Sequence, residues 1–441
     1  MASAYLTRST GTPDSRTKFT LSAWFKPSLS SSGNGEVFGF YGSNDYFAVR
    51  TQSSSALDII LYDNSTIARK GSTRKFRDCS GFYHILVALD TSLSTAEDRI
   101  KIYINNERIT DFTNDTNFSQ DAEVIRSSMA TVGVGTNVDQ NGDRANFDGI
   151  ITHAHYCDGY AYSPTDFGST DSTTGIWKPK TSPSVSYGTA GFFLDFADSS
   201  AMGNDVSGNN NDLTVSGTIT QTIDTPSNVF CTGNPLDTRV SFAPNFSNGN
   251  LTIAGGGSGT GDRTCRGTLG FSKGKYYWEV KYTSNSSGNS AWQGIINSEV
   301  QLGQGNTQAS ETTNSVLFNL NGGELKKNGT TIATYSGAVN DIFGFAYDLD
   351  AGTLKIHKNG TYFNSGNAVV TSISADTYLP YFAPNSGSSY VIMNPNFGNG
   401  YFGTTAVASA GTNAGIGTFE YDVPSGYKAL CTKNINAQEY S

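Results

Sequence analysis

Hydrophobic and polar residues alternate with a period of two in many short runs of this chain, the pattern of strands with one buried face. The run Phe19–Phe25 alternates apolar residues with Thr20, Ser22 and Trp24, and Ile100–Ile104 places isoleucines on one face. In the second half, Tyr276–Tyr282 alternates in the same way. Very few stretches keep helical spacing without a Gly or Pro. The pattern predicts an all-β protein.

Short Asn- and Gly-containing turns separate these runs. Asn105-Asn106 directly follows the isoleucine run, and Asn328-Gly329 and Asn359-Gly360 follow Lys-containing strands. Asn and Gly tolerate the positive φ that a two-residue hairpin requires. The neighbouring strands are therefore predicted to pair antiparallel.

The spacing of the strands indicates the domain organisation. The 441-residue chain has regular strands at 17–160, a Ser/Thr/Gly/Asn/Pro-rich stretch at 161–237, and further strands up to about residue 400. We predict two tandem antiparallel β-sandwich domains of jelly-roll type, 1–225 and 238–400, with the boundary near 225–240. Residues 401–441 are predicted to form a C-terminal extension that is either a docking strand or partly disordered.

Composition and charge narrow the functional classes. The net charge of −9 argues against binding to nucleic-acid backbones, which requires clustered Lys and Arg. The five cysteines are widely scattered and lack metal-ligand spacing, so we expect buried free thiols in a protein made in a reducing cytoplasm. The N-terminus lacks the apolar segment of a signal peptide. The sequence contains no run of 18 apolar residues, so we expect no insertion into a membrane.

The sequence offers little for catalysis. Retaining glycan hydrolysis uses two carboxylates about 5 Å apart, yet no two Glu residues are two or four positions apart. Gly270–Gly274 matches Gly-x-Ser-x-Gly but leads into a predicted strand, where the hydrolase nucleophile requires a helix. His153 and His155 share a strand face without a convincing third zinc ligand. We predict that the protein is not an enzyme and requires no cofactor.

The first half resembles the laminin-G-like, concanavalin A-like lectin superfamily over roughly residues 15–215. The resemblance is carried, in order, by Phe19–Pro27, Lys101–Asn106 and Phe147–Ile150, with a closing segment near Tyr162–Pro164. This fold also occurs in glucanases, so a glycan hydrolase stays the least favoured alternative.

The second half resembles a SPRY-type sandwich related to B30.2 domains. Its motifs are Gly274–Val280, Phe343–Asp350, Leu354–Gly360, Tyr378–Phe382 and Asn394–Gly398. The order of the two domains is similar to that of bacteriophage tail-fibre or capsid-associated proteins.

That resemblance implies a virion structural protein, made in the host cytoplasm, that assembles with other virion proteins as a homo-oligomer. It implies host-surface attachment or glycan binding. The alternatives are a capsid decoration or cement protein without receptor binding, and a non-viral lectin or adhesion module.

Two sets of residues are candidate sites. Asp195, Asp198, Asp205 and Asp212 place hard oxygen ligands in one stretch, as calcium requires, although Asp side chains also cap turns. The resemblance favours calcium slightly, because laminin-G-like domains often bind it in a rim loop. Glycan binding needs aromatic rings beside polar side chains on rim loops. The candidates for glycan binding are Tyr41, Asp45, Tyr46, Asp158 and Tyr160, with Tyr162 beside them.

Overall fold

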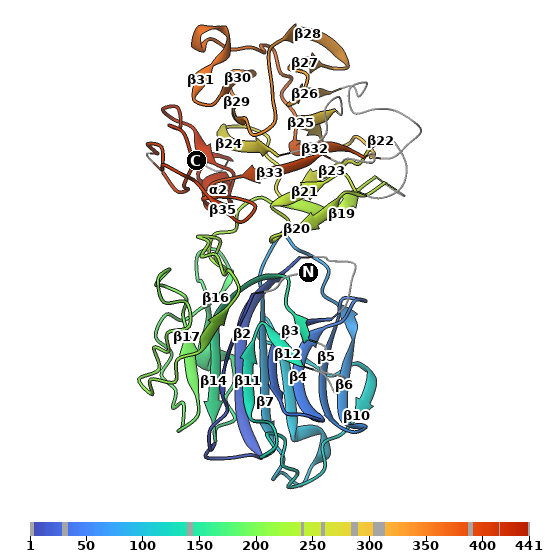
Figure 1. The fold of residues 1–441 in the computed structure, drawn as a ribbon, viewed down its shortest axis with the longest axis vertical. Helices are drawn as coiled ribbons and strands as arrows, with labels where there is room; N and C mark the ends of the chain where they lie inside the picture. Colours follow the sequence, from blue (N-terminus) through green and yellow to red (C-terminus); the bar gives the residue numbers. More distant parts are fainter. Residues whose placement is uncertain are drawn as a thin grey trace. The chain divides into compact units, whose positions relative to one another are not determined.

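In the computed structural model the chain forms two compact units, Met1–Gln221 and Thr222–Ser441 (Figure 1). The structure describes residues 4–28, 34–138, 144–239, 242–256, 261–283, 290–302, 314–386, 391–413 and 415–439. Nearly all of its elements are strands in antiparallel sheets, which confirms the prediction of two tandem β-sandwich domains. Among these residues no helix is long and apolar enough to cross a membrane.

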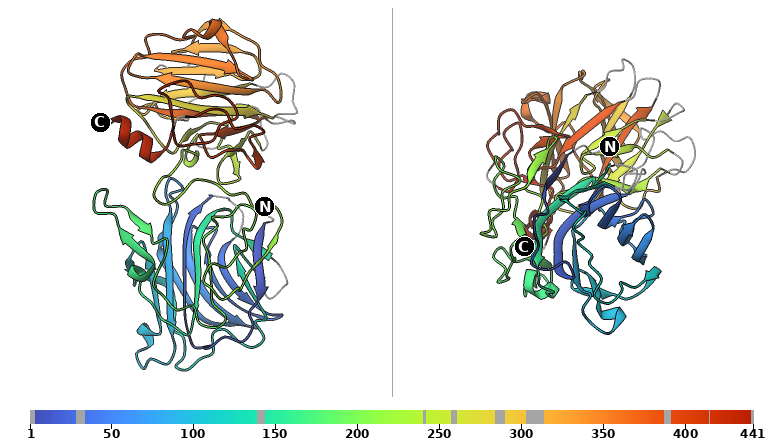
Figure 2. Two further views of the ribbon diagram at one scale, coloured as in Figure 1. Left: turned by 90° about the vertical axis from the view of Figure 1, so that its left-hand side faces the viewer. Right: turned by 60° about the horizontal axis from the view of Figure 1, so that its bottom comes forward.

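The first unit packs an eight-stranded sheet against a six-stranded sheet (Figure 2). In spatial order the first sheet contains β10 (Phe112–Thr116), β6 (Thr66–Lys75), β5 (Ala56–Asp63), β4 (Asp45–Thr51), β3 (Gly35–Tyr41), β11 (Thr131–Val134), β1 (Tyr5–Ser9) and β18 (Thr214–Ser216). The second contains β17 (Phe192–Leu194), β14 (Gly149–Asp158), β2 (Lys18–Pro27), β7 (Tyr83–Asp90), β8 (Ile100–Ile104) and β9 (Glu107–Ile109). Smaller elements are η1 (Ala96–Asp98), α1 (Pro164–Phe167) and the pairs β12 (Thr136–Val138) with β13 (Arg144–Asn146) and β15 (Gly168–Thr170) with β16 (Trp177–Pro179).

An aromatic and aliphatic core fills the space between these two sheets. Phe19 of β2 packs edge-on against Phe47 of β4, with ring centroids 5.6 Å apart. The isoleucines of β8 are buried while Lys101 and Tyr103 are partly exposed, as the alternation predicted. Asn105 and Asn106 have φ values of 51° and 70°, so the predicted tight turn is confirmed.

Strand β2 differs from the prediction in one respect. We expected a half-buried strand, yet every residue from Phe19 to Pro27 is buried. Residues between 162 and 187 lie over the outer face of β2, where Trp24 belongs to a second apolar cluster with Phe167. The alternation therefore identified the core face, and it could not show that a long connection covers the other face.

The second unit is also a sandwich of two sheets. One contains β19 (Gly233–Thr238), β23 (Cys265–Gly267), β32 (Tyr378–Ser386), β25 (Ala291–Asn297), β26 (Ser315–Asn319), β27 (Glu324–Lys327) and β28 (Thr330–Thr334), with β22 (Gly261–Asp262) on β32. The other contains β20 (Asn245–Ser247), β21 (Thr252–Ala254), β33 (Ile392–Asn396), β24 (Lys275–Tyr282), β29 (Ile342–Asp348), β30 (Thr353–Lys358) and β31 (Thr361–Tyr362), with β36 (Lys428–Ala429) on β24. The remaining elements are β34 (Tyr401–Phe402), β35 (Thr405–Ala406), η3 (Phe363–Gly366) and α2 (Thr432–Glu439).

Trp278 lies at the centre of the second core. Its ring stacks on Tyr347 of the neighbouring strand, with centroids 4.8 Å apart. Asn328 and Asn359 each have a φ of 50°, and a Gly with positive φ follows each of them, as the two predicted Asn-Gly hairpins require. All five cysteines of the chain are buried and none forms a disulfide, as expected.

The end of the chain packs onto the second unit. Strand β36 pairs in parallel with β24, and Leu430 is buried in the unit's core. Helix α2 follows at the C-terminal end of the chain (Figure 2). In the described residues the end of the chain is therefore a docked strand followed by a helix. Of the two predicted forms, it is closer to the docking strand than to the partly disordered extension.

Candidate functional site

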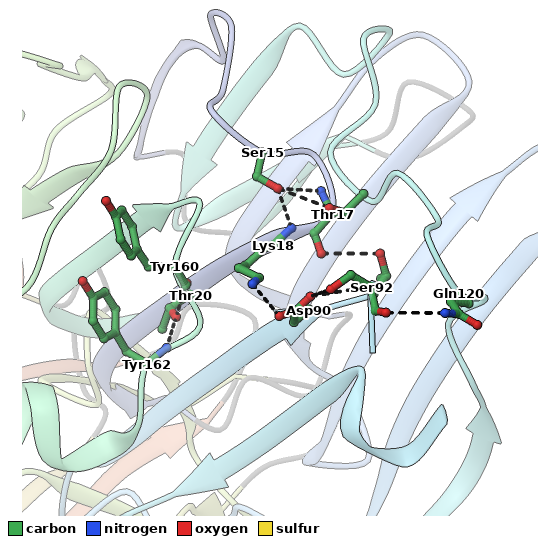
Figure 3. A network of polar contacts seen from close by, with 10 residues as sticks. Ser15, Thr17, Lys18, Thr20, Asp90, Ser92, Gln120, Tyr160 and Tyr162 are labelled. Atoms are coloured by element: carbon green, nitrogen blue, oxygen red, sulfur yellow. Dashed lines mark hydrogen bonds and ion pairs between the residues drawn. The ribbon is translucent and has the colours of Figure 1, made fainter. Parts of the chain in front are cut away.

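A buried threonine organises one end of the first unit. The hydroxyl of Thr20 donates a hydrogen bond to the carbonyl oxygen of Tyr160 and accepts one from the N–H of Tyr162, each over 2.8 Å (Figure 3). Thr20 has no exposed surface, because its strand is central in the sheet. The short segment that follows β14 is therefore fixed in position by the sheet beneath it.

The two tyrosine rings stack on each other. Their centroids lie 5.6 Å apart with an angle of 14° between the rings, and Figure 3 shows them projecting side by side. Tyr160 is 42% exposed. Tyr162 is held from the other side by Phe167, which meets it edge-on, and its hydroxyl accepts a hydrogen bond from the N–H of Ser186. The open aromatic surface of the pair therefore belongs to Tyr160.

The stacked rings of Tyr160 and Tyr162 form a tyrosine platform. An ion pair lies on the sheet face to which Thr20 holds this platform. Lys18 Nζ is 2.7 Å from Asp90 Oδ2, and the pair remains partly exposed (Figure 3). Lys18 and Thr20 are two residues apart in β2, so their side chains point to the same face about 7 Å apart. Burial acts to raise the pKa of Asp90, but hydrogen bonds from Lys18 and Ser92 outweigh it and lower the pKa. A charged donor and a charged acceptor thus lie on the same sheet face as Thr20, which holds the backbone of Tyr160 and Tyr162.

Asp158 has a structural role in this region. Its side chain is buried, and its oxygens accept the backbone N–H groups of Asp14, Ser15 and Ala190 over 2.6, 3.1 and 3.2 Å. Asp158 therefore joins the end of β14 to residues 14–15 and to Ala190, and its side chain does not face outward.

The other predicted glycan-binding residues are buried. Tyr41, Asp45 and Tyr46 are 8%, 6% and 5% exposed. Tyr46 stacks on Tyr62 at 5.2 Å, and Asp45 accepts a hydrogen bond from the hydroxyl of Ser128. Of the residues predicted to bind glycan, Tyr160 has an open ring, supported by its neighbour Tyr162.

The four aspartates of the predicted calcium site accept hydrogen bonds from nearby backbone. Asp205 is buried and accepts the N–H groups of Phe193 at 2.8 Å, Ser207 at 2.9 Å and Asn211 at 2.8 Å. Its own N–H donates to Asp212 over 2.8 Å. Asp195 and Asp198 cap separate turns at Ala197 and Ser200. Among the described residues no three His, Cys, Asp or Glu side chains are grouped to hold a metal ion. The contacts are those of turn caps, and calcium binding stays a prediction.

The second unit buries a carboxylate, Glu279, that no sequence motif identifies. Glu279 accepts hydrogen bonds from the Tyr277 hydroxyl at 2.9 Å, from the N–H groups of Glu420 and Tyr421 at 2.8 and 2.9 Å, and from the Asn396 amide at 3.4 Å. Burial raises the pKa of Glu279 to about 7, although the four donors act in the opposite direction. Tyr277 also contacts His357 over 2.7 Å. The chain's own C-terminal segment covers this cluster, so it is an anchor and not an open site.

Thr20 and the Lys18–Asp90 pair were not predicted from the sequence. The available signal was the polar outer face of β2, where Lys18, Thr20 and Ser22 follow one another at every second position. Once such a face is buried, its polar side chains need hydrogen-bond partners.

Comparisons with known proteins agree with this architecture. Residues 2–159 match the family model of the concanavalin A-like lectin/glucanases superfamily, and residues 275–397 match the SPRY domain. No curated protein matches the chain.

Solved structures are similar to part of the chain. The SPRY domain of human HERC1 is 18% identical and covers 37% of this chain and 96% of that one, with a TM-score of 0.30. The PSpry domain of TRIM65 is 14% identical, with 38% and 91% coverage and a TM-score of 0.29. Stonustoxin is 16% identical, with 38% and 27% coverage and a TM-score of 0.28. The two family matches confirm both resemblances: the chain carries a concanavalin A-like domain followed by a SPRY domain.

Proposed function

We propose that this is a non-catalytic binding protein of a bacteriophage virion, on the tail or the capsid, whose first unit binds glycan of the host surface at Tyr160. One observation carries the binding site: an exposed tyrosine is held in place on a buried hydroxyl and stacked on a second ring. The domain order and the acidic charge support the proposed place in a virion, and the scarcity of catalytic motifs supports a non-catalytic role.

The chemistry of the rim suits a sugar. The apolar C–H face of a pyranose can pack on the open ring of Tyr160, while Lys18 and Asp90 offer a donor and an acceptor to its hydroxyl groups. The platform is preorganised, because Thr20 fixes the backbone on both sides of residue 161. Preorganisation reduces the conformational entropy lost on binding.

A glycan-binding assay on the full chain tests the site. Cell-surface polysaccharides of candidate hosts are arrayed, and titration calorimetry then compares the unaltered protein with Tyr160→Ala. We expect affinity to fall about tenfold, as the loss of roughly 1.4 kcal/mol of aromatic contact requires. Ile67→Ala is the control, since Ile67 is also an exposed apolar side chain of the first unit, on β6. Equal affinity of Tyr160→Ala and the unaltered protein would contradict the site.

The viral context has a separate test. Mass spectrometry of purified particles and imaging with a labelled antibody should find the protein on the virion, and sedimentation should show an oligomer. A monomer that is missing from particles would leave a non-viral lectin or adhesion module. Particle-bound protein that binds no host glycan would indicate a decoration protein. Release of reducing sugar from the arrayed polysaccharides would instead indicate a hydrolase.

A further inference from the structure

Residues 163–187 form a covering segment over the outer face of the six-stranded sheet in the first unit. The segment contains α1 and the β15–β16 hairpin, which is a two-stranded sheet of its own. Two-stranded hairpins are marginally stable unless they pack on something else. The hairpin packs through Trp177, whose ring lies so close to Gly168 that a Cβ there would be 2.4 Å from it. The residues between the two strands are largely exposed.

Trp177 also ties the hairpin to the sheet. Its indole N–H donates to His84 Nδ1 over 3.0 Å, and His84 Nε2 lies 2.8 Å from the Ser22 hydroxyl. An indole nitrogen only donates, so Nδ1 of His84 must carry a lone pair. The ring is therefore neutral with its proton on Nε2, which donates to Ser22. Protonation of Nδ1 removes the acceptor that Trp177 needs.

A second histidine makes a further tie, close to the backbone hydrogen bond in which Asp158 N–H donates to the Tyr187 carbonyl over 2.9 Å. His155 Nδ1 lies 3.0 Å from the Tyr187 hydroxyl, and the His155 ring stacks on Phe193 at 4.0 Å. His155 is completely buried, and its Nε2 has no hydrogen-bond partner. A proton on that nitrogen would be a buried donor without an acceptor, which is unfavourable. Both side-chain hydrogen bonds described between the covering segment and this sheet face thus end on a histidine.

Among the described residues no carboxylate acts directly on His84 or His155. Asp166 of α1 acts on the neighbouring Cys157, and Asp205 acts on Tyr187. His84 stacks on Trp24 at 3.7 Å, and the neighbouring side chains of β7, β14 and α1 are apolar or neutral: Leu86, Ala88, Cys157 and Phe167. His153 acts on both histidines, His84 also acts on His155, and Asp195 acts on His153. Burial, and then the nearby His153, lower the pKa of His84 to about 3, and the same causes lower that of His155 well below its usual value.

We propose that residues 163–187 are an acid-released flap, latched onto the sheet by the neutral rings of His84 and His155. In the closed form neither ring accepts a proton without losing a hydrogen bond or burying an unpaired N–H. In the open form both rings are hydrated and titrate normally. Acid therefore favours opening, which uncovers the aromatic outer face around Trp24.

The size of the effect follows from linkage. A histidine that titrates near pH 6.5 only in the open form raises the opening equilibrium about tenfold for each pH unit below 6.5. Two such histidines together raise it by up to about a hundredfold per unit. Above pH 7 the flap is closed.

Hydrogen exchange of the full chain between pH 7.5 and 5.0, corrected for the intrinsic exchange rate, tests the flap. We expect opening of residues 168–179 to increase at least tenfold per unit below pH 6.5. His84→Gln should flatten that slope, whereas His357→Gln, at a buried histidine of the second unit, should leave it unchanged. A slope of zero in the unaltered protein, or an equal slope in His84→Gln, would overturn the proposal.

A second measurement needs no variant and covers the case in which His84→Gln fails to fold. Long-range ¹H–¹⁵N spectra of the unaltered protein at pH 7.5 report which imidazole nitrogen carries the proton. The flap requires an unprotonated Nδ1 in His84 and a hydrogen-bonded indole N–H in Trp177. A protonated Nδ1 would overturn the latch.

Discussion

The carboxylate of Glu279 accepts the backbone N–H of Tyr421 over 2.9 Å, although the two residues are 142 positions apart. Through the Tyr277 hydroxyl the same cluster reaches His357. Burial raises the pKa of Glu279 to about 7 and lowers that of His357 to about 4. An acid and a base with opposite shifts are thus buried side by side.

We predict that their effects on the pH dependence of stability cancel. Glu279 gains protons on folding, so its contribution to stability is present below pH 4.5 and is lost as pH rises towards 7. His357 loses protons on folding, so its contribution is present above pH 6.5 and is lost as pH falls towards 4. The free energy of unfolding of the second unit should stay nearly constant between pH 4.5 and 6.5.

Single variants should separate the two slopes. With Glu279→Gln the stability of the second unit should fall with falling pH, and with His357→Gln it should fall with rising pH. Each change should also lower stability by about 1–3 kcal/mol, because buried partners lose hydrogen bonds. Hydrogen exchange of the β24 amides at several pH values reports both quantities. Parallel slopes in the two variants would contradict the cancellation.

The first unit should be the acid-sensitive half of the chain. Its three histidines, His84, His153 and His155, all have pKa values lowered, first by burial. Their contribution to stability is complete above pH 6.5 and is lost as pH falls below it, since the unfolded chain binds protons that the folded unit excludes. Urea unfolding followed by hydrogen exchange at pH 7.5 and 5.5 should show a large loss for the first unit. Equal losses in both units would contradict this.

Thr20→Val is expected to lower both the stability of the first unit and its affinity for glycan. The change keeps the shape of the side chain but leaves the Tyr160 carbonyl and the Tyr162 N–H without their partner. We expect a loss of about 1–3 kcal/mol in unfolding free energy and a weaker glycan affinity. Thermal unfolding and calorimetry measure the two effects. Thr214→Val on the exposed strand β18 is the control and should change neither.

Asp205→Ala tests whether its loop depends on calcium. The carboxylate accepts three backbone N–H groups, so we expect a loss of roughly 1–3 kcal/mol that is the same with calcium and with a chelator. Asp198→Ala, at an exposed turn, should lose much less. Stabilisation of the unaltered protein by calcium that disappears in Asp205→Ala would instead establish the predicted metal site.

Much of the fold could be predicted because local signals agreed with it. The isoleucines of β8 and the turn at Asn105-Asn106 specify a strand and a hairpin without reference to the rest of the chain. The site was less predictable, because it depends on long-range burial. Tyr41 and Tyr46 have the same local composition as Tyr160, yet the first two pack against neighbouring strands and only the third has an open ring. Likewise, nothing near Glu279 in sequence indicates that residues 420 and 421 will cover it.

Glycan binding at Tyr160 is tested most directly by the response of individual tyrosine rings to ligand. In protein with ¹³C-labelled tyrosine rings, titration with oligosaccharides from the host surface should shift the resonances of Tyr160 and Tyr162 and leave those of Tyr41 and Tyr46 unchanged. Shifts at Tyr41 and Tyr46 with Tyr160 unaffected would place the ligand elsewhere and contradict glycan binding at Tyr160.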